Sequence, residues 1–132
     1  MNTTAVPSAP ETAASLRISD EQAVEAYRQL GEGHVYVLEP TDPTRFRMAN
    51  PFSTVPTAYK VEVSGKSYYG NCVWDGLGIV SLMGGTGQLK THCPDCGETL
   101  TLVVSDRALV HEEGVVHFSI PAAHWWDDII YT

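Results

Sequence analysis

The 132-residue chain has little positive charge, with 8 Lys and Arg against 16 Asp and Glu and a formal net charge of −8. Nucleic-acid binding needs a basic face that neutralises phosphates, and an anionic membrane surface attracts the same charge. We therefore expect neither nucleic acid nor a membrane as a partner. The chain also lacks any apolar run near the roughly 20 residues that span a bilayer.

Cysteine is also scarce, because the chain has only three. Three thiols cannot all pair within one chain. The first residues, MNTTAVP, lack the basic start and apolar stretch of a secretory signal. Free thiols in a reducing cytoplasm are therefore the expected state. The length favours one domain with an N-terminal appendage.

The first half of the chain shows a tail, a helix and a hairpin. Residues 1–17 are rich in Ala, Thr, Ser and Pro, which offer little apolar surface to offset ordering, so we predict a disordered tail. Ser19 and Gln22 match a capping box, and Gly31 and Gly33 end that helix. A strand at 34–38 and a turn at 40–43 follow. Together with the hairpin predicted below, residues 18–70 form a winged-helix-like subdomain.

That hairpin and the second half of the chain complete an α+β prediction. Ser64 and Gly65 form a turn signal between strands at 59–63 and 66–69. Asn71 is placed to cap a helix over 72–83 that ends at two glycines. Four strands and a short helix then follow, so that residues 71–132 form a core. The strands are expected at 88–91, 99–104, 108–111 and 115–120, and the helix begins at Pro121.

Cys72 and Asp75 are the first candidate site. At the first turn of a helix, unpaired N–H groups favour a thiolate, which predicts a lowered pKa for Cys72. Asp75 lies three residues on, so both side chains share a face. A neighbouring thiolate would raise the pKa of Asp75 and suit it to proton donation. The alternative is structural, with Cys72 as a small buried apolar residue and Asp75 as a helix-start carboxylate.

The motif HCPDCG at residues 92–97 is the second candidate site, because it resembles half of a zinc knuckle. A structural zinc site needs four ligands. Cys72 and one of His111, His117 or His124 could complete it in space. The alternative is a simple β-turn with Cys93 packed inside. For a non-catalytic module that binds zinc, copper or mercury, the candidate ligands are Cys72, Cys93, Cys96 and His92.

The order of several motifs resembles the alkylmercury (organomercurial) lyase family, from about residue 20 to the end. The most specific part is Cys-x-x-Asp at a helix start, followed by a glycine-rich helix end and a His-Cys pair on the next strand. The resemblance implies a mixed sheet with flanking helices. The segments that carry it are PFS at 51–53, YKVEV at 59–63, YGNCVWD at 69–75, THC at 91–93 and WDDI at 126–129.

The resemblance also implies an activity, the protonolytic cleavage of a carbon–mercury bond in a small organometallic substrate. In this family a cysteine that matches Cys72 binds mercury, and soft thiolates select soft metals. An aspartate that matches Asp75 protonates the carbon, and the cysteine that matches Cys93 is structural. The family needs no organic cofactor or catalytic metal, and small cytosolic thiols carry the product away. Bound mercury or zinc is the metal that these thiols could hold.

The chain departs from the family pattern at one place. The second catalytic cysteine of the family follows the segment that resembles 126–132, and this sequence stops at Thr132. We therefore expect a short or truncated member, in which Cys96 could substitute only if its turn folds over Cys72. Three hypotheses follow: a lyase-like enzyme, a metal-binding module, and an accessory domain with a vestigial site. The sequence predicts no oligomeric state.

Overall fold

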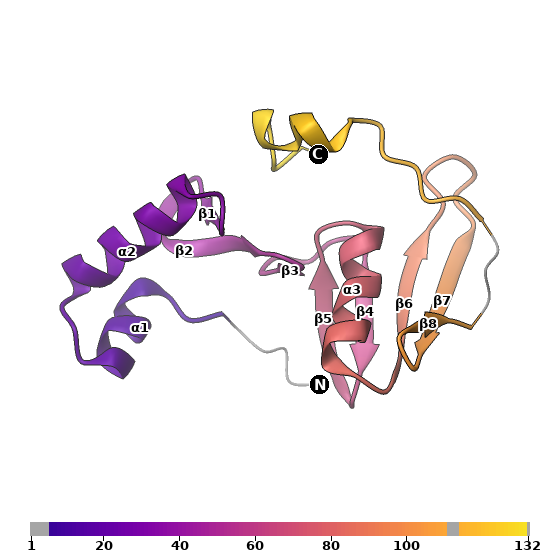
Figure 1. The fold of residues 1–132 in the computed structure, drawn as a ribbon, viewed down its shortest axis with the longest axis horizontal. Coiled ribbons are helices and arrows are strands. Elements are labelled where there is room, and N and C mark those ends of the chain that lie inside the picture. The colour runs from indigo at the N-terminus through magenta and orange to yellow at the C-terminus, as the bar shows by residue number, and fades with distance from the viewer. Residues whose placement is uncertain (1–5, 111–113, 132) are drawn as a thin grey trace.

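The computed structural model describes residues 6–110 and 114–131, and it has an α+β fold, as the sequence predicted (Figure 1). The described strands form one eight-stranded sheet in the order β1-β2-β3-β5-β4-β6-β7-β8. Every neighbouring pair is antiparallel, in place of the mixed sheet that we expected. No helix in these two ranges is long and apolar enough to cross a membrane. The strands are β1 (Val37–Glu39), β2 (Asp42–Ala49), β3 (Phe52–Ser53), β4 (Lys60–Val63), β5 (Lys66–Gly70), β6 (Thr86–His92), β7 (Thr99–Ser105) and β8 (Ala108–Leu109).

The predicted N-terminal tail contains a helix, α1 (Ala9–Leu16), so the disordered tail is wrong for these residues. Ala9 and Ala13 are buried against Ala23 and Tyr27 of the next helix, α2 (Asp20–Glu32). The Tyr27 hydroxyl also donates to the Pro7 carbonyl at 3.0 Å. Small alanine side chains let the two helices approach closely. This packing stabilises α1, although its residues are only weakly hydrophobic. Residues 1–5 of the expected tail lie outside the described range.

Helix α2 begins at the predicted capping box and covers strands β1 and β2. Ser19 accepts from the Gln22 backbone N–H at 3.2 Å, and the Gln22 side chain accepts from the Ser19 backbone N–H at 2.9 Å. Tyr27 stacks on Phe46 of β2 with ring centroids 4.0 Å apart. Strand β2 occupies part of the turn expected at 40–43, so the N-terminal unit pairs α2 with β1 and β2.

The main core lies between the sheet and helix α3 (Val73–Met83). Figure 1 shows α3 over β4 and β5, beside β6. The hairpin of β4 and β5 has the predicted register, with Val63 opposite Lys66. The sequence pattern assigns this hairpin to the N-terminal subdomain, but in the structure it shares its core with α3. The buried residues of that core are Val61, Val63, Ile79, Val80, Leu89 and Val104.

The C-terminal segment differs most from the prediction. The strand expected at 115–120 does not form, and the strand expected at 108–111 is reduced to β8 within the described residues. The alternating apolar residues at 115–120 pair with no neighbouring strand, and Val115 is 92% exposed. The predicted helix is a 3₁₀ helix, η1 (Ala122–Asp127). Its Trp126 stacks on His34 with centroids 4.0 Å apart, so the segment contacts the N-terminal unit.

Two glycines of α3 allow a matched stability test. A Cβ at Gly76 would lie 2.8 Å from the Leu89 side chain, whereas one at Gly78 would meet nothing closer than 4.0 Å. Leu89 is fully buried and cannot give way. We expect Gly76→Ala to lower the free energy of unfolding by about 1–3 kcal/mol. Gly78→Ala should raise it by up to about 1 kcal/mol, because alanine favours helix. Urea unfolding measures both, and equal effects would contradict the packing.

Candidate active site

Cys72 is the N-cap of α3, so the helix begins one residue later than predicted. Its backbone is extended, with φ −141° and ψ −178°, and its Sγ accepts from the Asp75 backbone N–H at 3.4 Å. The side chain of an N-cap residue normally accepts such a bond. The Cys72 sulfur therefore lies against the unpaired N–H groups at the helix start, three residues before the carboxyl of Asp75.

The close packing of β5 against α3 fixes this position. A Cβ on Gly70, the last residue of β5, would lie 2.6 Å from the Gly76 backbone nitrogen and 3.1 Å from the Cys72 carbonyl oxygen. Only glycine permits such an approach of two backbones. The chain therefore turns directly from the sheet into α3, and the thiol stays at the end of β5.

Burial raises the pKa of the Cys72 thiol. The side chain is half-buried, and a low-dielectric environment disfavours the charged thiolate. The backbone N–H of Asp75 acts in the opposite direction but has the smaller effect. Our prediction of a lowered pKa was therefore wrong, because it considered the helix start and not the burial. Cys72 rests as a protonated thiol.

Burial also raises the pKa of the Asp75 carboxyl. Hydrogen bonds from the side chains of Asn71 and Cys72 lower it, but they do not cancel the burial. The direction agrees with our prediction, whereas the cause is desolvation and not repulsion by a thiolate. The site therefore places a thiol and a carboxyl side by side, and each group has a higher proton affinity than it has in water.

Asn71 and Asn50 adjoin this pair, and sequence reasoning did not assign either to the site. The Asn71 side-chain amide donates to the Asn50 side-chain oxygen at 3.0 Å. Asn50 precedes Pro51 just before β3, and this Asn-Pro signal marks a turn that could have drawn attention. The Asn71 side chain also lowers the pKa of the Asp75 carboxyl, so it belongs to the surroundings of the acid.

Cys93 and Cys96 lie together in the turn between β6 and β7. The neighbouring backbone N–H groups of Cys96 and Asp95, together with the Cys96 side chain, lower the pKa of the Cys93 thiol. Cys93 is half-buried, whereas Cys96 and His92 are exposed. The turn is closed, because the Gly97 N–H donates to the Cys93 carbonyl at 2.9 Å, and Cys93 is half-buried within it.

The structure does not bring the four predicted metal ligands into one site. Within residues 6–110 and 114–131, no group of three or more His, Cys, Asp or Glu residues is placed to hold a metal ion. Of the histidines considered for such a site, His124 interacts with Asp127 at 3.0 Å and His111 lies outside the described residues. The four-ligand zinc hypothesis is therefore not supported. The thiols instead form two separate groups, Cys72 with Asp75 and Cys93 with Cys96.

The opposite pKa shifts of two cysteines predict an order of alkylation. Only the thiolate is nucleophilic. At neutral pH we expect iodoacetamide to modify Cys93 before Cys72, because the pKa of Cys93 is lowered and that of Cys72 is raised. Peptide mass spectrometry after short exposures measures the order. In the urea-unfolded chain the difference should disappear, and a faster reaction at Cys72 in the folded chain would contradict the assignment.

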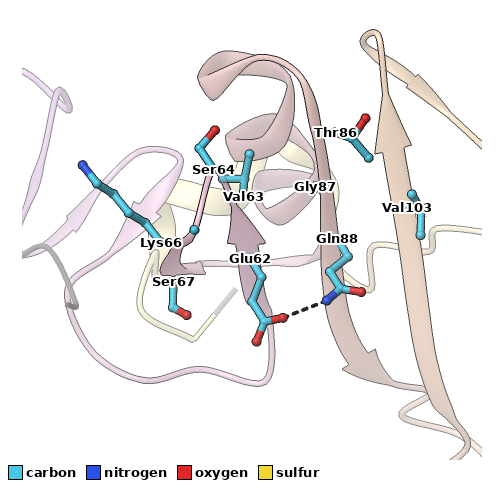
Figure 2. Close-up of a pocket in the computed structure, with 10 residues that line it drawn as sticks. Glu62, Val63, Ser64, Lys66, Ser67, Thr86, Gly87, Gln88 and Val103 are labelled. Carbon is cyan, nitrogen blue, oxygen red and sulfur yellow. Dashed lines mark hydrogen bonds between the residues drawn. The ribbon is translucent and has the colours of Figure 1, made fainter. Parts of the chain in front are cut away.

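A cavity of about 390 Å³ lies at the other end of the sheet (Figure 2). It is lined by the ends of β4 and β6, where Val63 lies opposite Gly87. The Glu62 carboxylate accepts from the Gln88 amide at 2.7 Å, and Lys90 and Lys60 lower its pKa to about 2. This charge network is satisfied and contains no thiol, so it is separate from the cysteine sites.

A half-buried thiol at a helix N-cap beside a half-buried carboxyl, on an antiparallel α+β scaffold, defines a site that combines a soft ligand with an acid. The family model described as alkylmercury lyase (MerB) matches residues 52–132, which is more than half of the sequence. The chain therefore belongs to the alkylmercury lyase family.

Solved structures show the same fold. The crystal structure of the mercury-bound form of MerB2 matches with a TM-score of 0.64 and 17% sequence identity. The match covers 82% of this chain and 51% of that chain, so this chain spans about half the length of that protein. At this identity the shared property is the fold. No curated protein matches the sequence.

Proposed function

We propose that the chain cleaves carbon–mercury bonds by protonolysis, with Cys72 as the mercury ligand and Asp75 as the acid. One observation carries the proposal: a member of the alkylmercury lyase family holds a thiol and a carboxyl, both half-buried, at the start of one helix. Mercury is a soft metal that thiolates bind well. A positioned carboxyl supplies the proton that the leaving carbon needs.

The substrate is an organomercurial whose mercury also carries a thiolate from solution. The Cys72 sulfur bonds to mercury and its proton passes to the Asp75 carboxylate, since metal coordination deprotonates a thiol. The Asp75 carboxyl then gives this proton to the carbon as the C–Hg bond breaks. One S–Hg bond and one C–H bond form, while one S–H bond and one C–Hg bond break. The step is a proton transfer coupled to ligand exchange, so it needs neither an oxidant nor a reductant.

Burial of both groups supports this sequence of steps. A low-dielectric site strengthens the interaction of the carboxyl with charge that develops on the carbon. The raised pKa of Asp75 makes the carboxyl a better acceptor for the thiol proton. The second ligand of mercury comes from a small solution thiol, so a single protein thiol satisfies the chemistry. Hg²⁺ then leaves Cys72 by exchange with another thiol, which frees Cys72 for the next turnover.

The experiment is an assay with phenylmercury and excess 2-mercaptoethanol, in which gas chromatography measures benzene. We expect benzene release above the rate given by the thiol alone, and repeated turnovers while thiol is present. The heat-denatured chain provides the control. Benzene release no faster than that of the thiol alone would contradict the proposed activity.

A further inference from the structure

The turn that carries Cys93 and Cys96 lies at the same end of the sheet as Cys72. Lys60 at the start of β4 is opposite Tyr69 of β5 and opposite Lys90 of β6. The last residues of β5 and β6 therefore lie at the same end of the sheet. Cys72 follows β5 closely, and Cys93 follows β6 directly. Figure 1 shows the turn between β6 and β7 and the first turn of α3 at this same upper end.

The turn holds the two sulfurs together without a disulfide. The Gly97 N–H donates to the Cys93 carbonyl at 2.9 Å, and the Cys93 N–H donates to the Glu98 carbonyl at 2.8 Å. Gly97 has a φ of +76°, which glycine adopts at little cost. Cys93 and Cys96 are three residues apart within this closed turn, so their side chains start close together. Both cysteines are free, and Cys96 is exposed, so a metal ion can reach the pair.

The number of ligands at the Cys93 and Cys96 pair favours Hg²⁺ over zinc. Zinc in a structural site takes four ligands, and no third His, Cys, Asp or Glu accompanies this pair among the residues that the structure describes. Hg²⁺ is softer and is satisfied by two thiolates. A pair of thiols on one turn also binds more tightly than two separate monothiols, because the second bond forms within one molecule.

We propose that Cys93 and Cys96 form a second mercury site, which accepts Hg²⁺ from Cys72 after the carbon–mercury bond has been cleaved. The transfer rests on the proposed function, whereas binding of Hg²⁺ by the pair does not. In the transfer, the Hg–S bonds to Cys72 and to the solution thiolate break, and bonds to Cys93 and Cys96 form. The two thiol protons pass to Cys72 and to the released thiolate, and no redox change occurs.

The binding test uses the full chain with Cys72→Ser, so that catalysis plays no part. The protein is loaded with HgCl₂, dialysed against 2-mercaptoethanol and weighed by native mass spectrometry. We expect one Hg²⁺ per chain. Adding Cys96→Ser should weaken retention roughly 100-fold or more, the range expected when a two-point attachment is lost. Because Cys96 is exposed, this change should leave the fold intact, and circular dichroism verifies it.

Three outcomes would overturn the second site: no Hg²⁺ retained by the Cys72→Ser chain, equal retention after Cys96→Ser is added, or one Hg²⁺ shared by two chains. The transfer has its own test in the chain with all three cysteines. After one turnover of phenylmercury, peptide mapping should find Hg²⁺ on the segment with Cys93 and Cys96. Hg²⁺ that remains on Cys72 would overturn the transfer, whereas absent benzene would overturn the proposed function instead.

Discussion

Replacing Cys72 by serine is expected to reduce benzene release from phenylmercury to the rate given by the solution thiol alone. The hydroxyl oxygen is a hard ligand that does not compete for mercury, so neither the S–Hg bond nor the proton transfer can occur. Serine is a favoured N-cap residue, and Cys72 occupies the N-cap of α3. Helix α3 should therefore form as before. The loss of benzene release should then come from the missing thiol and not from misfolding.

The matched control for this variant lies in the same helix. Gly78→Ala introduces a methyl group that meets nothing closer than 4.0 Å, so it should keep the activity of the parent chain. Circular dichroism and urea unfolding verify that both variants fold. Full activity in Cys72→Ser would remove the thiol from the mechanism and leave the proposed function without its metal ligand.

Replacing Asp75 by asparagine is expected to slow benzene release by roughly 10²–10⁴-fold, the usual contribution of a positioned general acid. Asparagine keeps the shape of the side chain but cannot carry the proton from the thiol to the carbon. Gas chromatography under the conditions of the Cys72→Ser assay measures the loss. A rate within a factor of two of the parent chain would contradict the assignment of Asp75.

The same variant should be more stable than the parent chain at neutral pH. Because burial raises the folded-state pKa of Asp75 above its ordinary value of 3.8, the folded chain binds the proton more strongly than the unfolded chain. The parent chain therefore loses stability as the pH rises from that value through the folded-state pKa. Asparagine never ionises and avoids this loss.

Urea unfolding of both chains at acid and neutral pH separates the two roles of Asp75. The advantage of Asp75→Asn should be largest at neutral pH and should shrink as the pH falls below the ordinary carboxyl pKa. Lower activity together with lower stability at neutral pH would instead indicate that the Asp75 carboxylate stabilises the start of α3.

Local signals in the sequence predicted the elements that depend on neighbouring residues. The Ser19 capping box and the turn at Ser64 and Gly65 stabilise structure within a few positions, and both features formed in the predicted register. Helix α1 was missed because its stability comes from packing of Ala9 and Ala13 against another helix. The alternating pattern at 115–120 predicted a strand, but a strand also requires a partner that alternation does not reveal.

The candidate site also combines features that depend on neighbouring residues with features that depend on tertiary packing. The spacing of Cys72 and Asp75 predicted that they would adjoin at a helix start, and the structure places them there. The direction of the Cys72 pKa shift was wrong because burial depends on residues distant in sequence. Cys93 and Cys96 were visible in the sequence as a motif, but the motif could not show whether further ligands would join them. Among the described residues, no third His, Cys, Asp or Glu does.

The most direct test of the central claim is the benzene formed from phenylmercury in D₂O with 2-mercaptoethanol. If Cys72 supplies the proton through Asp75, the exchanged thiol delivers deuterium, and mass spectrometry should find singly deuterated benzene from the parent chain. The Cys72→Ser chain should give only the amount found with thiol alone. Equal yields from the two chains would contradict protonolysis at the Cys72–Asp75 site.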